Sequence, residues 1–172
     1  MPATVKVKIL VPALWTKQDS LRTGLDTLAL IKARTMRGIS STGARFKEYS
    51  SRPIYISKNA FPSPKGGRLS RTGDTVYYAK GYREYKKRSR KFGSGGARAT
   101  AEVDLTLTGN LMNGLQVIKH SKKSFTIGLI EPVRHYGYEV HDERPFIGLT
   151  FKESEMITQV IQRTMGRRIK GK

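Results

Sequence analysis

Hydrophobic and polar residues alternate along residues 5–11, and this period of two predicts a strand with one buried face. A helix is predicted over residues 17–37, because Thr16 can cap its first turn with Asp19 as the acidic partner three residues later. Gly38 is expected to end this helix. Its apolar stripe is predicted to consist of Leu21, Leu25, Leu28 and Met36.

Residues 39–75 have no regular hydrophobic period, and prolines and glycines are scattered through them. We expect a long extended segment here, with a short strand at residues 54–56. A loop of this length is uncommon in a compact domain unless it has a role of its own, such as reaching a neighbouring molecule.

A basic helix with a tyrosine stripe is predicted over residues 76–90, where three tyrosines fall at helical spacing. The stripe is formed by Tyr78, Tyr82 and Tyr85. Residues 93–99, GSGGARA, are typical of a flexible linker. The next segment, residues 102–107, returns to an alternating pattern and predicts a strand.

A short helix is predicted over residues 109–115, with Thr108 as its N-cap and with Leu107 and Met112 as a hydrophobic staple. After it, two apolar runs flank the polar residues 120–123 and predict a β-hairpin. The runs are residues 116–119 and 124–130, with apolar members Val117, Phe125, Ile127 and Leu129.

The last part of the chain begins with an irregular stretch that ends in Arg144-Pro145-Phe146. Pro145 fixes its own φ and restricts Arg144 to extended backbone, so Phe146 is expected to enter the core. Thr150 and Glu153 form a capping box at the start of a final amphipathic helix, which is expected to fray at its basic end. Its apolar face is predicted to contain Met156, Ile157, Val160, Ile161 and Met165.

Together these elements predict an α+β fold, in which a mainly antiparallel sheet is packed by an N-terminal and a C-terminal helix. A single domain is expected over residues 1–172, with its core in residues 4–38 and 100–166. Residues 39–99 would then form a long extended arm with the basic segment, and residues 167–172 a basic tail.

The net charge of the chain indicates the kind of partner it binds. The chain of 172 residues has 33 lysines and arginines against 13 acidic residues, a net charge of +20 that predicts a polyanion or an acidic protein surface as partner. No apolar run approaches the roughly 20 residues that span a bilayer, so no membrane partner is expected. Cysteine is absent, which excludes disulfides and thiolate nucleophiles from this sequence.

The basic positions are concentrated in residues 80–91 and 163–172. The lysines and arginines of the first cluster could neutralise phosphates while its tyrosines stack on single-stranded bases. Alternatively, it is a solvated basic helix whose tyrosines pack on the domain or on a neighbouring subunit. The candidate interaction residues are Tyr78, Tyr82, Arg83, Tyr85, Lys86, Lys87, Arg88, Arg90, Lys91, Arg167, Arg168 and Lys170.

The sequence contains no motif typical of catalysis or of cofactor binding. The glycines of GSGG follow a basic segment and belong to no phosphate-binding loop motif. The histidines, His120, His135 and His141, have neither HxxxH nor HExxH spacing, and no GxSxG elbow occurs. We therefore expect a protein that is not an enzyme and that has no metal and no cofactor.

Five short motifs occur in an order that resembles the tail-completion and head–tail joining proteins of tailed bacteriophages, the phage virion morphogenesis family. The resemblance covers residues 44–161. The motifs are ARFKEYS (44–50), YREYKKR (82–88), VDLTLTGNLMNGL (103–115), SFTIGL (124–129) and RPFIGLT (144–150). Two departures from the family pattern are HYGYEVHDE (135–143), which stands where members often have Y-A-x-x-H-x-x-G, and a longer stretch at 46–71.

The resemblance implies a structural protein of the virion, made in the bacterial host cytoplasm, that forms part of the neck ring between the DNA-filled head and the tail. It implies self-association into a hexameric ring, contacts with portal- or adaptor-side neck proteins and with the tail tube or terminator protein, and a possible contact with DNA in the channel. It also assigns structural roles to Thr108, Gly109, Leu111, Arg144, Pro145 and Phe146.

A small basic RNA-binding or ribosome-associated protein is the alternative. The net charge and the interleaving of lysine and arginine with tyrosine favour it, whereas the sequence contains no KH GXXG loop and no RNP aromatic motif. Steep salt dependence of binding would not separate the two hypotheses, because both describe a strongly basic protein.

Overall fold

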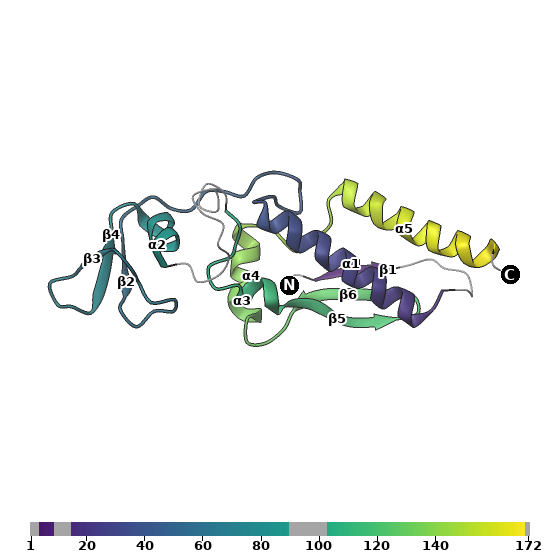
Figure 1. Ribbon diagram of the computed structural model, residues 1–172, viewed down its shortest axis with the longest axis horizontal. Helices are drawn as coiled ribbons and strands as arrows, with labels where there is room; N and C mark the ends of the chain where they lie inside the picture. The colour runs from purple at the N-terminus through teal and green to yellow at the C-terminus, as the bar shows by residue number, and fades with distance from the viewer. Residues whose placement is uncertain (1–3, 9–14, 90–102, 171–172) are drawn as a thin grey trace.

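The computed structural model describes residues 4–8, 15–89 and 103–170. Two lobes follow one another along the longest axis of the molecule (Figure 1). The core lobe contains the N-terminal and C-terminal helices and one antiparallel sheet, and the distal lobe, residues 54–89, contains a second antiparallel sheet and one helix. The predicted α+β class, with helices near both ends of the chain, is confirmed.

The core-lobe sheet has three antiparallel strands in the order β1-β6-β5. They are β1 (Val5–Lys8), β5 (Leu115–Ser121) and β6 (Ser124–Leu129). The predicted hairpin is confirmed, with a shorter turn, because Ser121 pairs with Ser124 and only two lysines lie between them. Residues 9–11 of the first predicted strand lie outside the described residues.

Helix α1 (Lys17–Met36) covers this sheet and is capped by Thr16 and Asp19 as predicted. Of the predicted stripe only Leu28 is buried, whereas Leu25 and Met36 are about half exposed, at 50% and 51%. Besides Leu28 and Ile31, the helix buries small and polar residues, including Ser20, Thr23, Gly24 and Thr27. The helix packs closely on the sheet at Gly24, where an added Cβ atom would lie 3.2 Å from the ring of Phe125. Larger side chains therefore do not fit at this contact.

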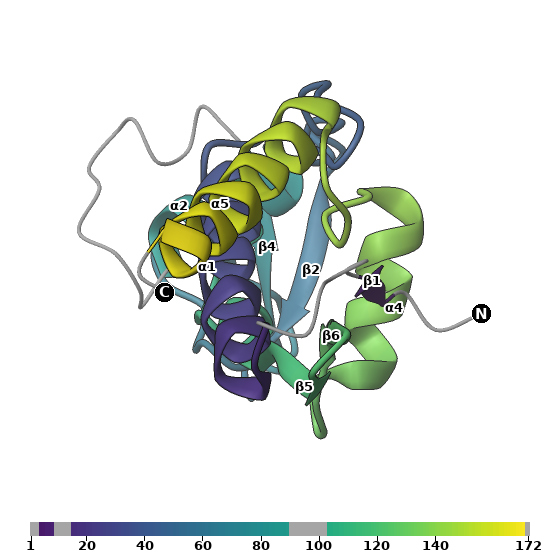
Figure 2. The same ribbon diagram turned by 90° about the vertical axis from the view of Figure 1, so that its right-hand side faces the viewer.

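Helix α5 (Phe151–Lys170) runs antiparallel to α1 and lies beside it (Figure 2). Its predicted capping box is confirmed, since the Thr150 N–H donates to Glu153 Oε2 at 2.8 Å and the Glu153 N–H donates to Thr150 Oγ1 at 3.2 Å. The helix does not fray after residue 166, because it continues to Lys170. Of its predicted apolar face, Ile157 is buried, whereas Met156 and Val160 are 42% and 37% exposed.

The segment before α5 enters the core as predicted, and the Phe146 side chain has no exposed surface. An additional helix, α4 (Arg134–Glu143), occupies most of the stretch that the sequence analysis described as irregular. Its apolar side chains are only partly buried, and Gly137 weakens helix propensity, so the sequence pattern did not reveal it. Gly137 is buried because its backbone approaches the Leu129 side chain closely.

The distal lobe occupies much of the stretch that was expected to be an extended arm. Its strands are paired antiparallel in the order β2-β4-β3. They are β2 (Ile54–Ser57), β3 (Arg68–Leu69) and β4 (Thr75–Tyr78). Helix α2 (Gly81–Ser89) packs on the sheet and is shorter than predicted, because residues 76–78 belong to β4. Val76, Tyr78 and Tyr85 form a small separate core.

Residues 103–108, which we call the strap, connect the two cores and do not form the predicted strand. Leu105 is buried in the core lobe, whereas Leu107 packs against the core of the distal lobe. The alternating pattern therefore serves two separate cores. The predicted linker at residues 93–99 lies outside the described residues.

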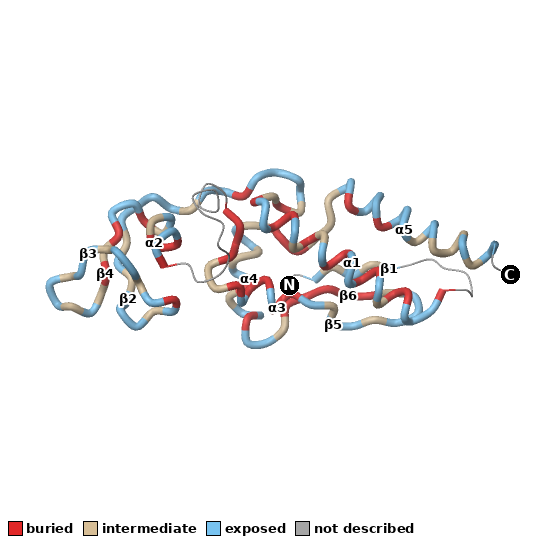
Figure 3. Tube along the Cα trace, in the orientation of Figure 1, coloured by how far each residue is buried: buried red, intermediate tan, exposed pale blue. Residues whose placement is uncertain are grey.

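Helix α3 (Asn110–Gly114) follows the strap, and its N-cap is Gly109, with a φ of 87°, in place of the predicted Thr108. Thr108 contributes through its Oγ1, which accepts a hydrogen bond from the Asn110 N–H at 3.3 Å. The predicted staple is also wrong, since Leu107 and Met112 belong to different cores. Buried residues are concentrated in the strap, in β6 and on one side of α1, whereas most of β5 and α5 is exposed or intermediate (Figure 3).

Replacing Phe146 by alanine should lower the free energy of unfolding by about 3–5 kcal/mol, because the ring is completely buried and its loss leaves a cavity. Phe151→Ala is the matched control, since that ring is 81% exposed and its removal should change stability by less than about 0.5 kcal/mol. Urea denaturation of both variants tests this, and equal midpoints for Phe146→Ala and wild type would contradict it.

Candidate functional site

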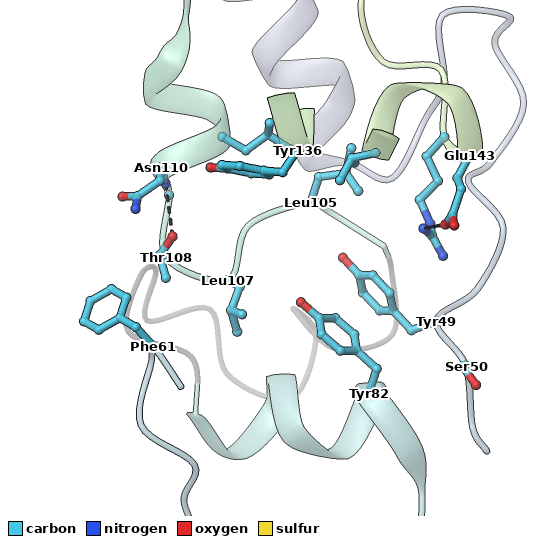
Figure 4. Close-up of a pocket in the computed structure, with 14 residues that line it drawn as sticks. Tyr49, Ser50, Phe61, Tyr82, Leu105, Leu107, Thr108, Asn110, Tyr136 and Glu143 are labelled. Atoms are coloured by element: carbon cyan, nitrogen blue, oxygen red, sulfur yellow. Dashed lines mark hydrogen bonds and ion pairs between the residues drawn. The ribbon is translucent and has the colours of Figure 1, made fainter. Parts of the chain in front are cut away.

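A pocket of about 560 Å³ lies where the strap passes between the two lobes (Figure 4). Tyr49 and Tyr82 project into it from one side, and Tyr136 of α4 lies on the other. The pocket is lined mainly by aromatic and aliphatic side chains, and Glu143 and Arg144 supply its charges. These two charged residues form an ion pair of 2.8 Å at its rim.

A buried ion pair between Lys86 of α2 and Asp104 of the strap lies next to this pocket and joins the two lobes. Lys86 Nζ also donates to the Tyr49 hydroxyl at 2.9 Å and lies 4.6 Å from the centroid of that ring. Burial alone would raise the pKa of Asp104, but its hydrogen bond and charge interaction with Lys86, together with the Thr106 hydrogen bonds, hold it below its usual value. Lys86 is therefore a structural residue and not part of an exposed basic surface.

The aromatic side of the pocket is held by ring contacts. The Tyr49 and Tyr82 rings have centroids 5.1 Å apart, and the Arg144 guanidinium lies 5.3 Å from the Tyr49 centroid. Arg144 Nε also donates to the Lys47 carbonyl at 3.2 Å. Burial raises the pKa of Tyr82 to about 12 and raises that of Tyr49 further, so both phenols stay protonated at neutral pH.

The pocket therefore offers stacking surfaces, hydroxyl groups and one charged pair, which suit binding better than proton transfer near neutral pH. Its lining contains no histidine. His141 of α4 has a structural role, because its Nδ1 accepts hydrogen bonds from the Phe146 and Ile147 N–H groups at 3.2 Å. Burial lowers the pKa of His141, which keeps that nitrogen available as an acceptor.

Residues of two predicted motifs meet at this pocket. Thr108, Gly109 and Leu111 line it from the strap and α3, and Arg144 lines it from the end of α4. Phe146 faces the core of the core lobe instead. The structure thus brings together segments that are more than 30 residues apart in the sequence.

The predicted tyrosine stripe is divided between packing roles. Tyr78 and Tyr85 are 0% and 3% exposed, and their hydroxyls donate to the carbonyls of Lys65 at 2.9 Å and Pro62 at 2.7 Å. Tyr82 belongs to the pocket. Of the two interpretations, packing is correct for Tyr78 and Tyr85, so neither is available to stack on a base.

The exposed cations of α2 are Arg83, Lys87 and Arg88, the last of which pairs with Glu84 at 2.8 Å. Arg90 and Lys91 lie outside the described residues. The second predicted cluster lies at the far end of the molecule, on the last turns of α5 (Figure 1). There, Arg167 and Lys170 are exposed, whereas Arg168 pairs with Asp19 at 2.7 Å.

Sequence reasoning missed two features on the outer faces of the sheets. The first is the outward row of lysines on the core-lobe sheet, where Lys6 and Lys119 both pair with Thr126. The second is a pair of outward tyrosines, Tyr55 and Tyr77, on the sheet of the distal lobe. Alternation around Tyr55 in residues 54–57 was the pattern that could have revealed the second feature.

Within the described residues, no group of three or more histidine, cysteine, aspartate or glutamate side chains could hold a metal ion. Over the same part of the chain, no helix has the length and apolar character needed to cross a bilayer. Comparison with protein-family models, curated proteins and solved structures finds no match.

Asp104→Asn should lower the free energy of unfolding at pH 7 by about 3–5 kcal/mol, because it leaves Lys86 buried without its counter-ion. The pKa of Asp104 is depressed in the folded state, so its contribution is present above the unfolded-state pKa of about 4 and is lost as the pH falls through the lower folded-state value. The difference between variant and wild type should therefore shrink below about pH 4.

Chemical denaturation at pH 7 and at a series of acidic pH values measures this difference. Glu131→Gln is the control, because it removes an exposed pair with Arg134 and should cost no more than about 1 kcal/mol. An Asp104→Asn variant as stable as wild type at pH 7 would show that the ion pair does not stabilise the fold.

Proposed function

We propose that this chain is a structural protein of the neck that joins the DNA-filled head to the tail of a tailed bacteriophage, as a tail-completion or terminator-like component. The proposal rests first on the order of the motifs along residues 44–161, which resembles the phage virion morphogenesis family. A structural role of this kind needs a stable surface for docking and no catalytic step.

The observation that carries the proposal is the meeting of the Thr108-Gly109 turn and Arg144 at one pocket between the lobes. These residues come from two of the motifs on which the resemblance depends. Their position at the junction supports a role in holding the distal lobe to the core lobe, so that one subunit can contact neighbours at both ends. Phe146 is buried and Pro145 accepts a hydrogen bond from the Ser41 N–H at 2.7 Å, so both anchor the chain before α5.

In this proposal several copies, six in a closed ring, assemble between the portal-side neck proteins and the tail tube or terminator. The exposed cations Arg83 and Lys87 at one end, and Arg167 and Lys170 at the other, meet acidic surfaces of adjacent rings or DNA in the channel. Like charges on identical subunits repel, so the contacts between copies should avoid these clusters.

An RNA-binding or ribosome-associated protein is the alternative function. The net charge of +20 favours it, and so does the outward-facing pair of Tyr55 and Tyr77 in the distal lobe. It does not account for the order of the motifs.

Immunogold labelling of particles from the source culture tests the neck proposal directly. Antibodies against this chain should place gold at the junction between head and tail in negatively stained virions. Antibodies against the major capsid protein serve as the control for surface labelling. Gold on ribosomes, or no gold on intact or tailless particles, would overturn the proposal.

A further inference from the structure

The distal-lobe sheet has one face that its own core does not use. On the inner face, Ile54, Val76 and Tyr78 pack with Tyr85 of α2. Successive residues of a strand point to opposite faces, so Tyr55 and Tyr77 point outward. The strand register places Tyr55 opposite Tyr77 and Tyr77 opposite Arg68, which gives a row across the sheet.

The two outward rings form an aromatic surface in which Tyr55 is exposed and Tyr77 is half-buried. Tyr55 is 65% exposed, and the ring centroids of Tyr55 and Tyr77 are 5.0 Å apart with an interplanar angle of 46°. Arg68 continues the row and is itself exposed. A large aromatic side chain stabilises a fold when it is buried, and an exposed ring does not contribute this stabilisation. The outward rings also take no part in the packing of the inner face.

The charge of the lobe limits what can cover this surface. Residues 54–89 contain nine lysines and arginines and two acidic residues, a net charge of +7. Eight of the nine are exposed, since only Lys86 is buried. A second copy of this +20 chain is therefore a poor partner, and an anionic partner is favoured.

Single-stranded nucleic acid has both negative charge and exposed aromatic rings, which are the two properties that complement this face. Its phosphates complement the lysines and arginines, and its unpaired bases have free π-faces that stack on tyrosine rings. In a duplex these π-faces are covered by neighbouring bases, so only the charge interaction would remain. An acidic protein would satisfy the charge but provides no regular series of flat rings.

We infer that the outer face of the β2-β4-β3 sheet binds single-stranded nucleic acid, with Tyr55 and Tyr77 stacking on bases and Arg68 contacting the phosphates. This inference goes beyond the neck role and does not depend on it, because it concerns an activity of the isolated chain. It also assigns stacking to tyrosines other than those of the predicted stripe.

Fluorescence anisotropy of the purified full chain with a labelled 12-nucleotide oligothymidine, and with a 12-base-pair duplex, tests this inference. Tyr55→Ala combined with Tyr77→Ala should weaken binding of the single strand by at least about fivefold and leave duplex binding unchanged. The matched control, Tyr55→Phe with Tyr77→Phe, keeps both rings and should bind the single strand as wild type does.

A second measurement uses only the wild-type chain, so it is independent of the folding of the variants. Photocrosslinking to a 4-thiothymidine oligonucleotide, followed by mass spectrometry, should give adducts at Tyr55 or Tyr77. The inference is overturned if the oligothymidine does not bind at physiological salt, as expected for a face that docks on protein. Equal losses for single strand and duplex, or adducts confined to other residues, would also overturn it.

Discussion

The Arg34 guanidinium is the group on which the core lobe depends, because it joins α1 to residues 146–153, which lie more than 100 positions further along the chain. It pairs with Glu153 of α5 and donates to the carbonyls of Phe146 at 2.6 Å and Gly148 at 3.1 Å. Glu153 is also the capping residue of α5, so one carboxylate both starts that helix and neutralises Arg34. The two carbonyls satisfy further N–H groups of the guanidinium, whereas within the described residues Arg34 Nε is buried without a hydrogen-bond partner. Loss of Glu153 would leave the Arg34 charge buried without its counter-ion, so the pair specifies how α5 packs on α1.

A second buried ion pair joins the two lobes. Lys86 and Asp104 join α2 to the strap, and Tyr49 adds a hydroxyl acceptor and a ring face to the same lysine. The position of the distal lobe, and hence the pocket, follows from this contact and from Leu107. The Arg34–Glu153 pair joins α1 to α5, whereas the Lys86–Asp104 pair joins α2 to an irregular segment, where backbone hydrogen bonding alone cannot specify a geometry.

Local sequence rules predicted the capped helices and the hairpin, because those elements are specified by neighbouring residues such as Thr16 with Asp19 and Thr150 with Glu153. They failed where tertiary contacts decide. The alternation in the strap serves two cores, and the tyrosines at helical spacing are shared between a strand and a helix. For the same reason the pocket was not predictable, although four of the residues that line it were singled out for structural roles.

In the proposed function the chain is a bridging subunit, whose two lobes are joined by the Lys86–Asp104 pair and whose positive charge is exposed at both ends. This function requires that the chain belongs to a virion. Sedimentation of the source lysate before and after nuclease treatment, with this chain followed by mass spectrometry, is the most direct measurement. The account predicts that the chain stays with large, nuclease-resistant particles. Release of the chain into small fractions by nuclease would contradict the account and support an RNA-associated protein.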